Sequence, residues 1–359
     1  MATLYYLYRF TLLLCLLTLV GCLPLEQHQS ASQPAASQIL PASMMEDIII
    51  HNEFSERADI GPVPEGIQGD RGIGFIREEH IHTPIDELPQ NEEFHLDAEM
   101  NTFEPFLVLM NNTDQPKTFL VTLMFNYRQV PFTFNEQFGL LHLIEIPPFS
   151  NIYFPMSVPI SETGRHDIQA VMFEDPFNLR MDYEFRRDVT GYAMGQRIAL
   201  TVGNDHTPAR TFDVLDLEKL PVSEEGISLD VMFRNSLQNQ ASDSALPHRA
   251  LIHTDTVQLE QPYPLQIIVS SDGEYDAGIK AVIPFLNYRQ IALEGQDVIV
   301  TSLGVEEEAF FNTELALPEE RGVHQLQAIY LVEPYANMLE NKELSPFVKG
   351  SMRVAFIVE

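Results

Sequence analysis

The sequence predicts an all-β protein built from two copies of one β-sandwich domain, and three observations support this fold class. Four segments recur in constant order about 160 residues further along the chain. Short apolar runs, some alternating apolar with polar side chains, are separated by turn-forming residues. No segment shows the long 3.6-residue periodicity with capped ends that is typical of a helix. Strands at this spacing favour a sandwich over an alternating β–α fold.

The repeats are the strongest of these observations. The matching segments are Phe125–Val130 with Leu286–Ile291, Gly164–Val171 with Gly322–Ile329, Asp175–Phe177 with Glu333–Tyr335, and Arg197–Val202 with Arg353–Val358. Four matches in the same order indicate a tandem duplication. We therefore expect one sandwich domain at residues 46–204 and a second at residues 205–359.

Apolar runs predict the strands of the first copy in order. They are Phe106–Met110, Thr118–Phe125, Leu140–Ile146 and Asn151–Val158, followed by the Gly164–Val171 segment and a last strand that ends at Val202. The run Asn151–Val158 places apolar side chains at every second position, which is the pattern of a strand with one buried face.

The second copy repeats this order. Apolar runs lie at Leu265–Val269 and Val298–Val300, before the C-terminal strand. Alternation at Gly226–Arg234 predicts a strand at the start of this copy, and residues 46–75 should supply its counterpart in the first.

The Gly164–Ala170 and Gly322–Ala328 segments, each followed by a short terminal strand, resemble the last two strands of immunoglobulin-like and fibronectin-III-like domains. The resemblance implies two packed antiparallel sheets in each copy. The core tryptophan and the inter-sheet disulfide of antibody domains are both absent from the sequence. The resemblance therefore concerns a broad group of folds and carries no function.

The N-terminus contains an apolar run, Phe10–Val20, preceded by the single charge of Arg9 and followed by Gly21-Cys22. The run has the length of the apolar core of a signal peptide and is short for a bilayer span. Leu19-Val20-Gly21-Cys22 resembles the lipobox of bacterial lipoproteins. The resemblance implies removal of residues 1–21, diacylation of Cys22, as with palmitate, and attachment to the cell envelope facing the periplasm or the outside. An ordinary secretory signal or a poor transmembrane helix is the alternative.

Composition limits what the remaining chain can do. Residues 22–45 are rich in Gln, Ser, Ala and Pro and read as a flexible tether. No cysteine follows Cys22, so disulfides and thiolate metal sites are excluded from the mature chain. With 52 acidic against 21 basic residues and a formal charge of −31, nucleic acid and anionic lipid headgroups are poor partners.

The repeated Asn-Tyr-Arg-Gln motif is the best candidate for a binding site. In one interpretation, Tyr127 with Arg128 and Tyr288 with Arg289 offer an aromatic face and a planar cation to a carboxylate, a sugar or an acidic loop. In the other, the motif is architectural, with the tyrosine packed into the core edge and the polar residues satisfying turn carbonyls. Both copies share the fold, which favours the architectural interpretation.

Metal-binding patterns are weak, and we expect no metal or cofactor. His80 and His82, with Glu78, Glu79 and His95 nearby, could supply ligands for zinc or copper, but a third fixed ligand is not evident. Asp272, Glu274 and Asp276 alternate as in calcium loops, without the spacing of an EF-hand. His166 and His324 occupy equivalent positions and are expected to be turn or edge histidines.

The sequence contains no nucleophile elbow, phosphate-binding loop, dinucleotide fingerprint or zinc-protease helix. We therefore expect a membrane-anchored lipoprotein that is not an enzyme and that binds a protein or glycan as an adhesion or scaffold module. Two alternatives remain: an accessory subunit of an envelope complex, and a carboxylate-based glycan hydrolase.

Overall fold

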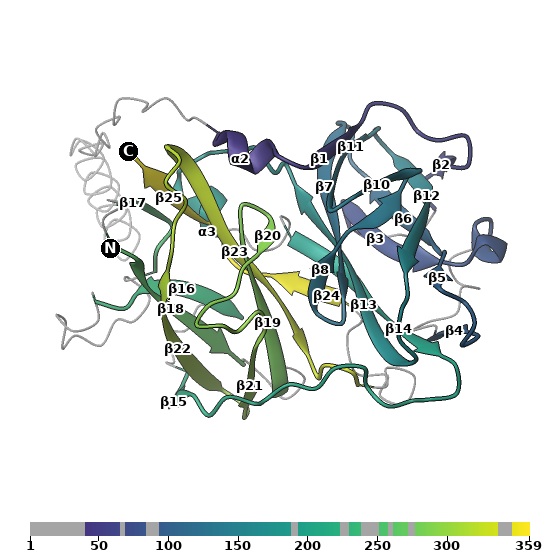
Figure 1. Cartoon of the computed structure of the whole chain (residues 1–359). Coiled ribbons are helices and arrows are strands. Elements are labelled where there is room, and N and C mark those ends of the chain that lie inside the picture. Colours follow the sequence, from purple (N-terminus) through teal and green to yellow (C-terminus); the bar gives the residue numbers. More distant parts are fainter. Residues whose placement is uncertain are drawn as a thin grey trace, which may run out of the picture. The chain divides into compact units, whose positions relative to one another are not determined.

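Most of the described residues form strands, drawn as arrows in Figure 1. A computed structural model describes residues 40–64, 69–83, 93–187, 193–222, 230–237, 251–257, 261–271, 277–336 and 347–359. The helices of this part are short: α2 (Ala42–Met45), α3 (Tyr183–Arg187) and the 3₁₀ helix η2 (Glu78–His80). None of its helices has the length and apolar character needed to cross a membrane.

The first copy contains two sheets. Its small sheet is built on β3 (Arg71–Ile76), β6 (Phe106–Asn111) and β12 (Ser150–Pro159), in that order. Its large sheet has the order β11 (Leu141–Ile146), β7 (Lys117–Phe125), β13 (Gly164–Glu174) and β14 (Ala193–Val202). β4 (Glu93–Leu96) pairs in parallel with the end of β14.

The second copy has the same connectivity. Its small sheet is ordered β15 (Glu218–Pro221), β22 (Glu307–Leu315), β18 (Tyr263–Ser270) and β16 (Val231–Asn235). Its large-sheet strands are β21 (Ile299–Leu303), β19 (Gly278–Leu286), β23 (Gly322–Val332), β24 (Phe347–Gly350) and β25 (Val354–Val358). β17 (Thr254–Val257) pairs in parallel with β25, as β4 does with β14.

Short strands complete the sheets. These are β1 (Ile48–His51), β2 (Asp59–Pro62), β5 (Thr102–Phe103), β8 (Arg128–Val130), β9 (Phe132–Phe134), β10 (Gln137–Gly139) and β20 (Arg289–Gln290). β2 pairs with β12 as β15 pairs with β22, so the segment before each copy adds an equivalent edge strand. β1 pairs in parallel with β11 at the end of the large sheet.

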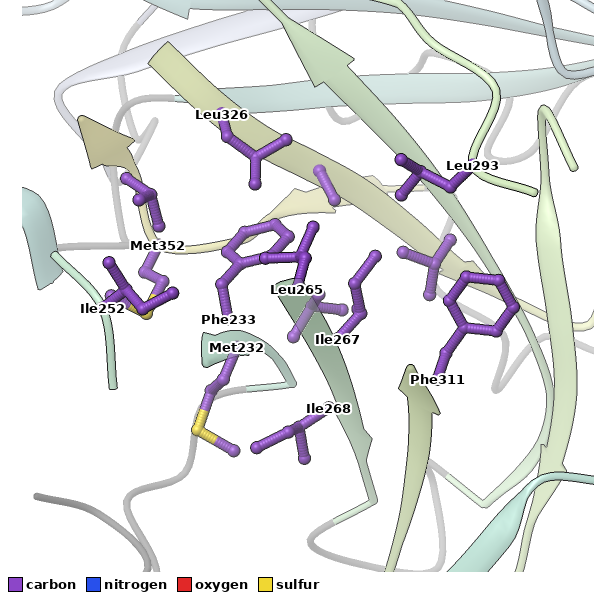
Figure 2. Packing of buried hydrophobic residues seen from close by; sticks show 14 of the residues in the cluster. Met232, Phe233, Ile252, Leu265, Ile267, Ile268, Leu293, Phe311, Leu326 and Met352 are labelled. Carbon is purple, nitrogen blue, oxygen red and sulfur yellow. The ribbon is translucent and has the colours of Figure 1, made fainter. Parts of the chain in front are cut away.

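Each copy encloses its own apolar core between its two sheets. In the first, Leu107, Leu123 and Ile168 belong to a buried cluster. In the second, Phe233, Leu265 and Leu326 belong to another, shown in Figure 2. Two mainly antiparallel sheets packed over such a core make a β-sandwich, so the predicted all-β fold of tandem immunoglobulin-like sandwiches is confirmed.

The strands predicted from apolar runs are also confirmed, with bounds that move by three residues at most. Thr118–Phe125 lies in β7, Asn151–Val158 in β12 and Leu265–Val269 in β18. Of the predicted strand Gly226–Arg234, only its later part is described, as β16. Cys22, the leader and residues 22–39 of the predicted tether lie outside the described residues. Residues 40–45, the end of that tether, are described: they include α2, and Met44 is 0% exposed, so this part packs against the sandwiches. The division at residues 204 and 205 stays a prediction.

Candidate functional site: the joint between the copies

A third apolar cluster joins the two copies. It combines Val171 and Phe173 of β13 with Phe285 of β19 and Ile329 of β23. The Phe173 ring lies with its centroid 5.8 Å from that of Phe285, in an edge-on arrangement. The neighbours of Val171 and Phe173 on β13 face the first core instead. Strand β13 is therefore buried on both faces, by its own sandwich on one and by the other copy on the other.

A backbone seam runs beside this cluster. β14 pairs antiparallel with β24, with Met194 opposite Lys349 and Gly195 opposite Val348, which makes one continuous sheet with 14 strands among the described residues. By the sequence repeat, β14 corresponds to β24 and β25. Antiparallel pairing of equivalent strands is what a two-fold axis produces, so the joint has the form of an interface between two identical subunits.

The Asn-Tyr dipeptides form tight hairpin turns at this joint. Asn126 and Tyr127 have φ values of 49° and 66°, and Asn287 and Tyr288 have 52° and 66°. Two left-handed residues between paired strands define a type I′ turn, which matches the twist of a hairpin. Asparagine adopts this conformation readily, whereas tyrosine does so only when its surroundings hold it.

The asparagine of the first turn is fixed by its neighbours. Asn126 Oδ1 accepts the N–H of Asp167 at 3.1 Å, so its Nδ2 faces His166 Nδ1 at 2.9 Å. His166 must then carry its proton on Nε2, which donates to the Glu162 carbonyl at 3.0 Å. Burial lowers the pKa of His166, which agrees with a neutral ring.

The second turn is held in the same way. Asn287 accepts the N–H of Gln325 at 3.0 Å and lies 2.9 Å from His324 Nδ1. His324 Nε2 lies 2.8 Å from the Glu320 carbonyl. The Asn of each repeated motif therefore builds a hairpin turn. His166 and His324, expected at a turn or an edge, lie fully buried inside β13 and β23, where each connects its strand to the turn.

The glutamines of the motif join the copies reciprocally. The Gln129 N–H donates to Gln290 Oε1 at 2.8 Å, and the Gln290 N–H donates to Gln129 Oε1 at 2.9 Å. Each side-chain amide then donates across the joint, Gln129 to the Tyr288 carbonyl and Gln290 to the Tyr127 carbonyl, both at 2.9 Å. Each glutamine thus binds the other copy's turn.

Tyr127 enters a buried charged cluster. Its hydroxyl donates to Asp167 Oδ2, and the same oxygen lies 3.1 Å from Arg197 Nε. From the second copy, the Tyr335 N–H donates to Asp167 Oδ2 at 2.9 Å. Burial and the Asp167 charge raise the pKa of Tyr127 well above its ordinary value. Asp167 and Arg197 are almost fully buried, so their charges depend on each other and on this turn.

Tyr288 meets a different environment. Its hydroxyl donates to the Pro176 carbonyl, which also accepts from Gln325 Nε2 at 3.0 Å. Gln325 Oε1 accepts from Arg186 at 3.0 Å, which fixes the amide orientation. Gln325 corresponds to Asp167, so one copy presents a donor where the other presents an acceptor.

The arginines of the motif lie at the rim. Arg128 pairs with Asp297 at 3.1 Å and keeps 67% of its side chain exposed. Arg289 donates to the Glu46 carbonyl and lies 3.6 Å from the Asp47 carboxylate. Tyr127 and Tyr288 are 0% and 1% exposed. The candidate binding residues therefore come together at one joint, with only the arginines reachable from solvent, and a binding role for them stays a prediction.

The metal candidates are scattered. His80 ends η2, His82 Nδ1 lies 3.5 Å from the Asp59 carboxylate, and His95 lies 3.9 Å from Glu93. Among the residues with described positions, no group of three His, Cys, Asp or Glu side chains is arranged to hold a metal ion. Asp272, Glu274 and Asp276 lie outside the described residues.

No protein-family model and no curated protein matches the sequence. Among solved structures, the calcium binding domain CBD12 of CALX1.1 is similar at 9% identity over 70% of this chain and 82% of that one, with a TM-score of 0.19. CBD12 from CALX1.2 gives 9% identity, 74% and 97% coverage and 0.20. The N-terminal domain of PorA gives 12% identity, 37% and 99% coverage and 0.22. Scores this low carry no argument about function.

Proposed function

We propose that the protein is a lipid-anchored module of a bacterial envelope that binds a protein or glycan without catalysis. Its two sandwiches act as one rigid scaffold that holds binding loops and sheet faces away from the membrane. Cys22 carries the lipid anchor, and the residues before Leu40 span the distance between the membrane and the sandwiches.

The main support for this proposal is the set of contacts that the repeated Asn-Tyr-Arg-Gln motif makes. Its asparagines build turns, its glutamines cross the joint, and its tyrosines are buried there. Because the equivalent residues of both copies hold the joint together, the fold itself explains why the motif is repeated. This supports a scaffold over a duplicated active site. The solvent-reachable arginines remain available for contact with an acidic partner.

Crosslinking in the native envelope, followed by affinity purification, tests the proposal. The wild-type chain is compared with Arg128→Ala/Arg289→Ala and with Cys22→Ser. We expect a defined protein or glycan partner with the wild type, weaker recovery with the arginine variant, and loss of the membrane fraction with Cys22→Ser. A membrane-integral complex as partner would favour the accessory-subunit role.

Two results would contradict the proposal. A processed glycan product released by the wild type would support a hydrolase. If Cys22→Ser still fractionates with the membrane, the protein is not anchored through a lipid on Cys22.

A further inference from the structure

Two buried histidines connect the first described strand to the first copy. His51 ends β1, His142 lies on β11, and they are 5% and 0% exposed. His51 Nε2 lies 3.0 Å from His142 Nδ1, and the rings stack with centroids 5.2 Å apart. Phe132 and Phe134 of β9 pack edge-on and tilted against the pair. The pair therefore sits in an apolar pocket at the end of the large sheet.

The hydrogen bonds around the pair fix one neutral tautomer for each ring. Asn135 Oδ1 accepts the Ser55 N–H at 2.7 Å, so Asn135 Nδ2 faces His51 Nδ1 at 3.3 Å. His51 Nδ1 is then an acceptor, and its Nε2–H donates to His142 Nδ1. The remaining His142 Nε2–H donates to the Gly139 carbonyl at 3.2 Å. A proton added to either ring places two donors face to face.

Few groups near the two histidines could stabilise a positive charge on either ring. Burial lowers the pKa of His51 to about 4, and burial with the nearby His51 lowers that of His142 to about 4. The charged residues nearest in sequence to the histidines and to Asn135 are Glu53, Glu136 and Glu145, whose side chains are exposed. Glu53 reaches the cluster through its carbonyl, which accepts from Asn135 at 2.9 Å.

The strand that the pair holds also secures the joint. β1 is the terminal strand of the large sheet and follows directly on the segment that contains Met44. Met44 is 0% exposed and packs in the cluster shared by the two copies. Glu320 of the second copy accepts the Ser43 N–H at 3.1 Å. We call residues 40–47, the segment before β1, the strap. Release of β1 would therefore loosen the strap, which contacts both copies.

We propose that His51 and His142 form an acid-sensitive latch: acidification protonates the pair and detaches β1 and the strap before it, while both sandwich cores persist. The folded pKa values lie below the ordinary 6.5, so the detached state binds more protons. The latch is then closed above about pH 6.5 and weakens as the pH falls toward 4.

Hydrogen–deuterium exchange of the full chain between pH 7 and pH 4.5, corrected for intrinsic rates, tests the latch. We expect exchange in residues 48–51 to rise roughly tenfold or more at pH 4.5, with strands β13 and β23 still protected. His51→Leu/His142→Leu should abolish this rise, whereas His82→Leu, at an exposed histidine, should retain it. Nitrogen-15 NMR of labelled histidines should show both rings neutral and protonated at Nε2 at pH 7.

Three results would overturn the proposal. The first is a rise that persists in the double leucine variant. The second is loss of β13 and β23 protection at the same pH as β1. The third is a ring that is charged at pH 7. If the double variant fails to fold, the histidine NMR titration of the wild type decides between the outcomes.

Discussion

Asp167 and Gln325 occupy the same position in the two copies, yet they meet the facing turn through opposite hydrogen-bonding groups. The Asp167 carboxylate accepts the N–H of Tyr335, whereas the Gln325 amide donates to the carbonyl of Pro176. Tyr335 has a φ of 59°, a left-handed conformation that presents its N–H to the carboxylate. A single change between the copies therefore accompanies a different orientation of the facing turn.

Replacing Asp167 tests the buried charge. Asp167→Asn leaves the Arg197 guanidinium buried beside a neutral amide and weakens the bond to Tyr335. We expect a loss of about 3–5 kcal/mol in the free energy of unfolding, because an uncompensated buried charge is costly. Chemical denaturation monitored by circular dichroism measures it.

The double variant Asp167→Asn/Arg197→Met is the control for that prediction. With both charges removed, much of the loss should be recovered, since a neutral pair carries a smaller desolvation cost. Additive losses from the two single variants would show that the ion pair is not the source of the effect.

The sequence singled out the repeated Asn-Tyr-Arg-Gln residues and favoured an architectural role with the tyrosine at the core edge, but it did not predict that they lie where the two copies meet. Tyrosine and arginine in a repeated turn fit either a surface site or an architectural turn, because the motif does not reveal what faces it. One indication was present: Ile168, Ala170, Val171, Met172 and Phe173 are consecutive or nearly so, without alternation. A strand of that kind is covered on both faces.

At the scale of elements, apolar runs and turn residues located the long strands of the first copy, but neither β19 nor β22 of the second was among the predicted strands. The pairing of β14 with β24 was not predictable, because its register depends on close backbone approach rather than on apolar pattern. A Cβ at Gly350 of β24 would lie 2.7 Å from Ala193 Cβ on β14, and one at Gly195 of β14 would lie 3.2 Å from Val348 Cβ on β24. The need for glycine at residue 350 can therefore be recognised only once the seam is known.

Gly350→Ala therefore tests the seam. The added methyl group must displace Ala193 of β14, which lies across the seam, and we expect a destabilisation of about 1–3 kcal/mol in denaturant unfolding. Gly61→Ala is the matched control, because a Cβ there meets no atom within 4 Å. Equal effects of the two substitutions would contradict the close packing of the seam.

The reciprocal glutamines give a second test at this scale. Gln129→Ala and Gln290→Ala each remove bonds to the facing turn, and each should cost about 1–3 kcal/mol of unfolding free energy. Because the two side chains share one hydrogen-bonded unit, the double variant should lose less than the sum, with a coupling of about 0.5–3 kcal/mol. Strict additivity would mean that the two glutamines act independently.

At the scale of the whole molecule, the two copies share a sheet, an apolar cluster and a charged cluster. Such a joint resembles an obligate subunit interface more than a flexible contact between domains. We therefore expect the two copies to unfold as one cooperative unit, and any partner to bind to surfaces outside the joint.

Differential scanning calorimetry of the purified chain at pH 7.5 shows whether the two copies unfold together. We predict a single transition whose calorimetric enthalpy equals its van't Hoff enthalpy, because neither copy can lose the joint and keep its own packing. The joint variant Gln129→Ala/Gln290→Ala should lower the midpoint of that one transition. Two separable transitions in the wild type, one for each copy, would contradict cooperative unfolding of the two copies.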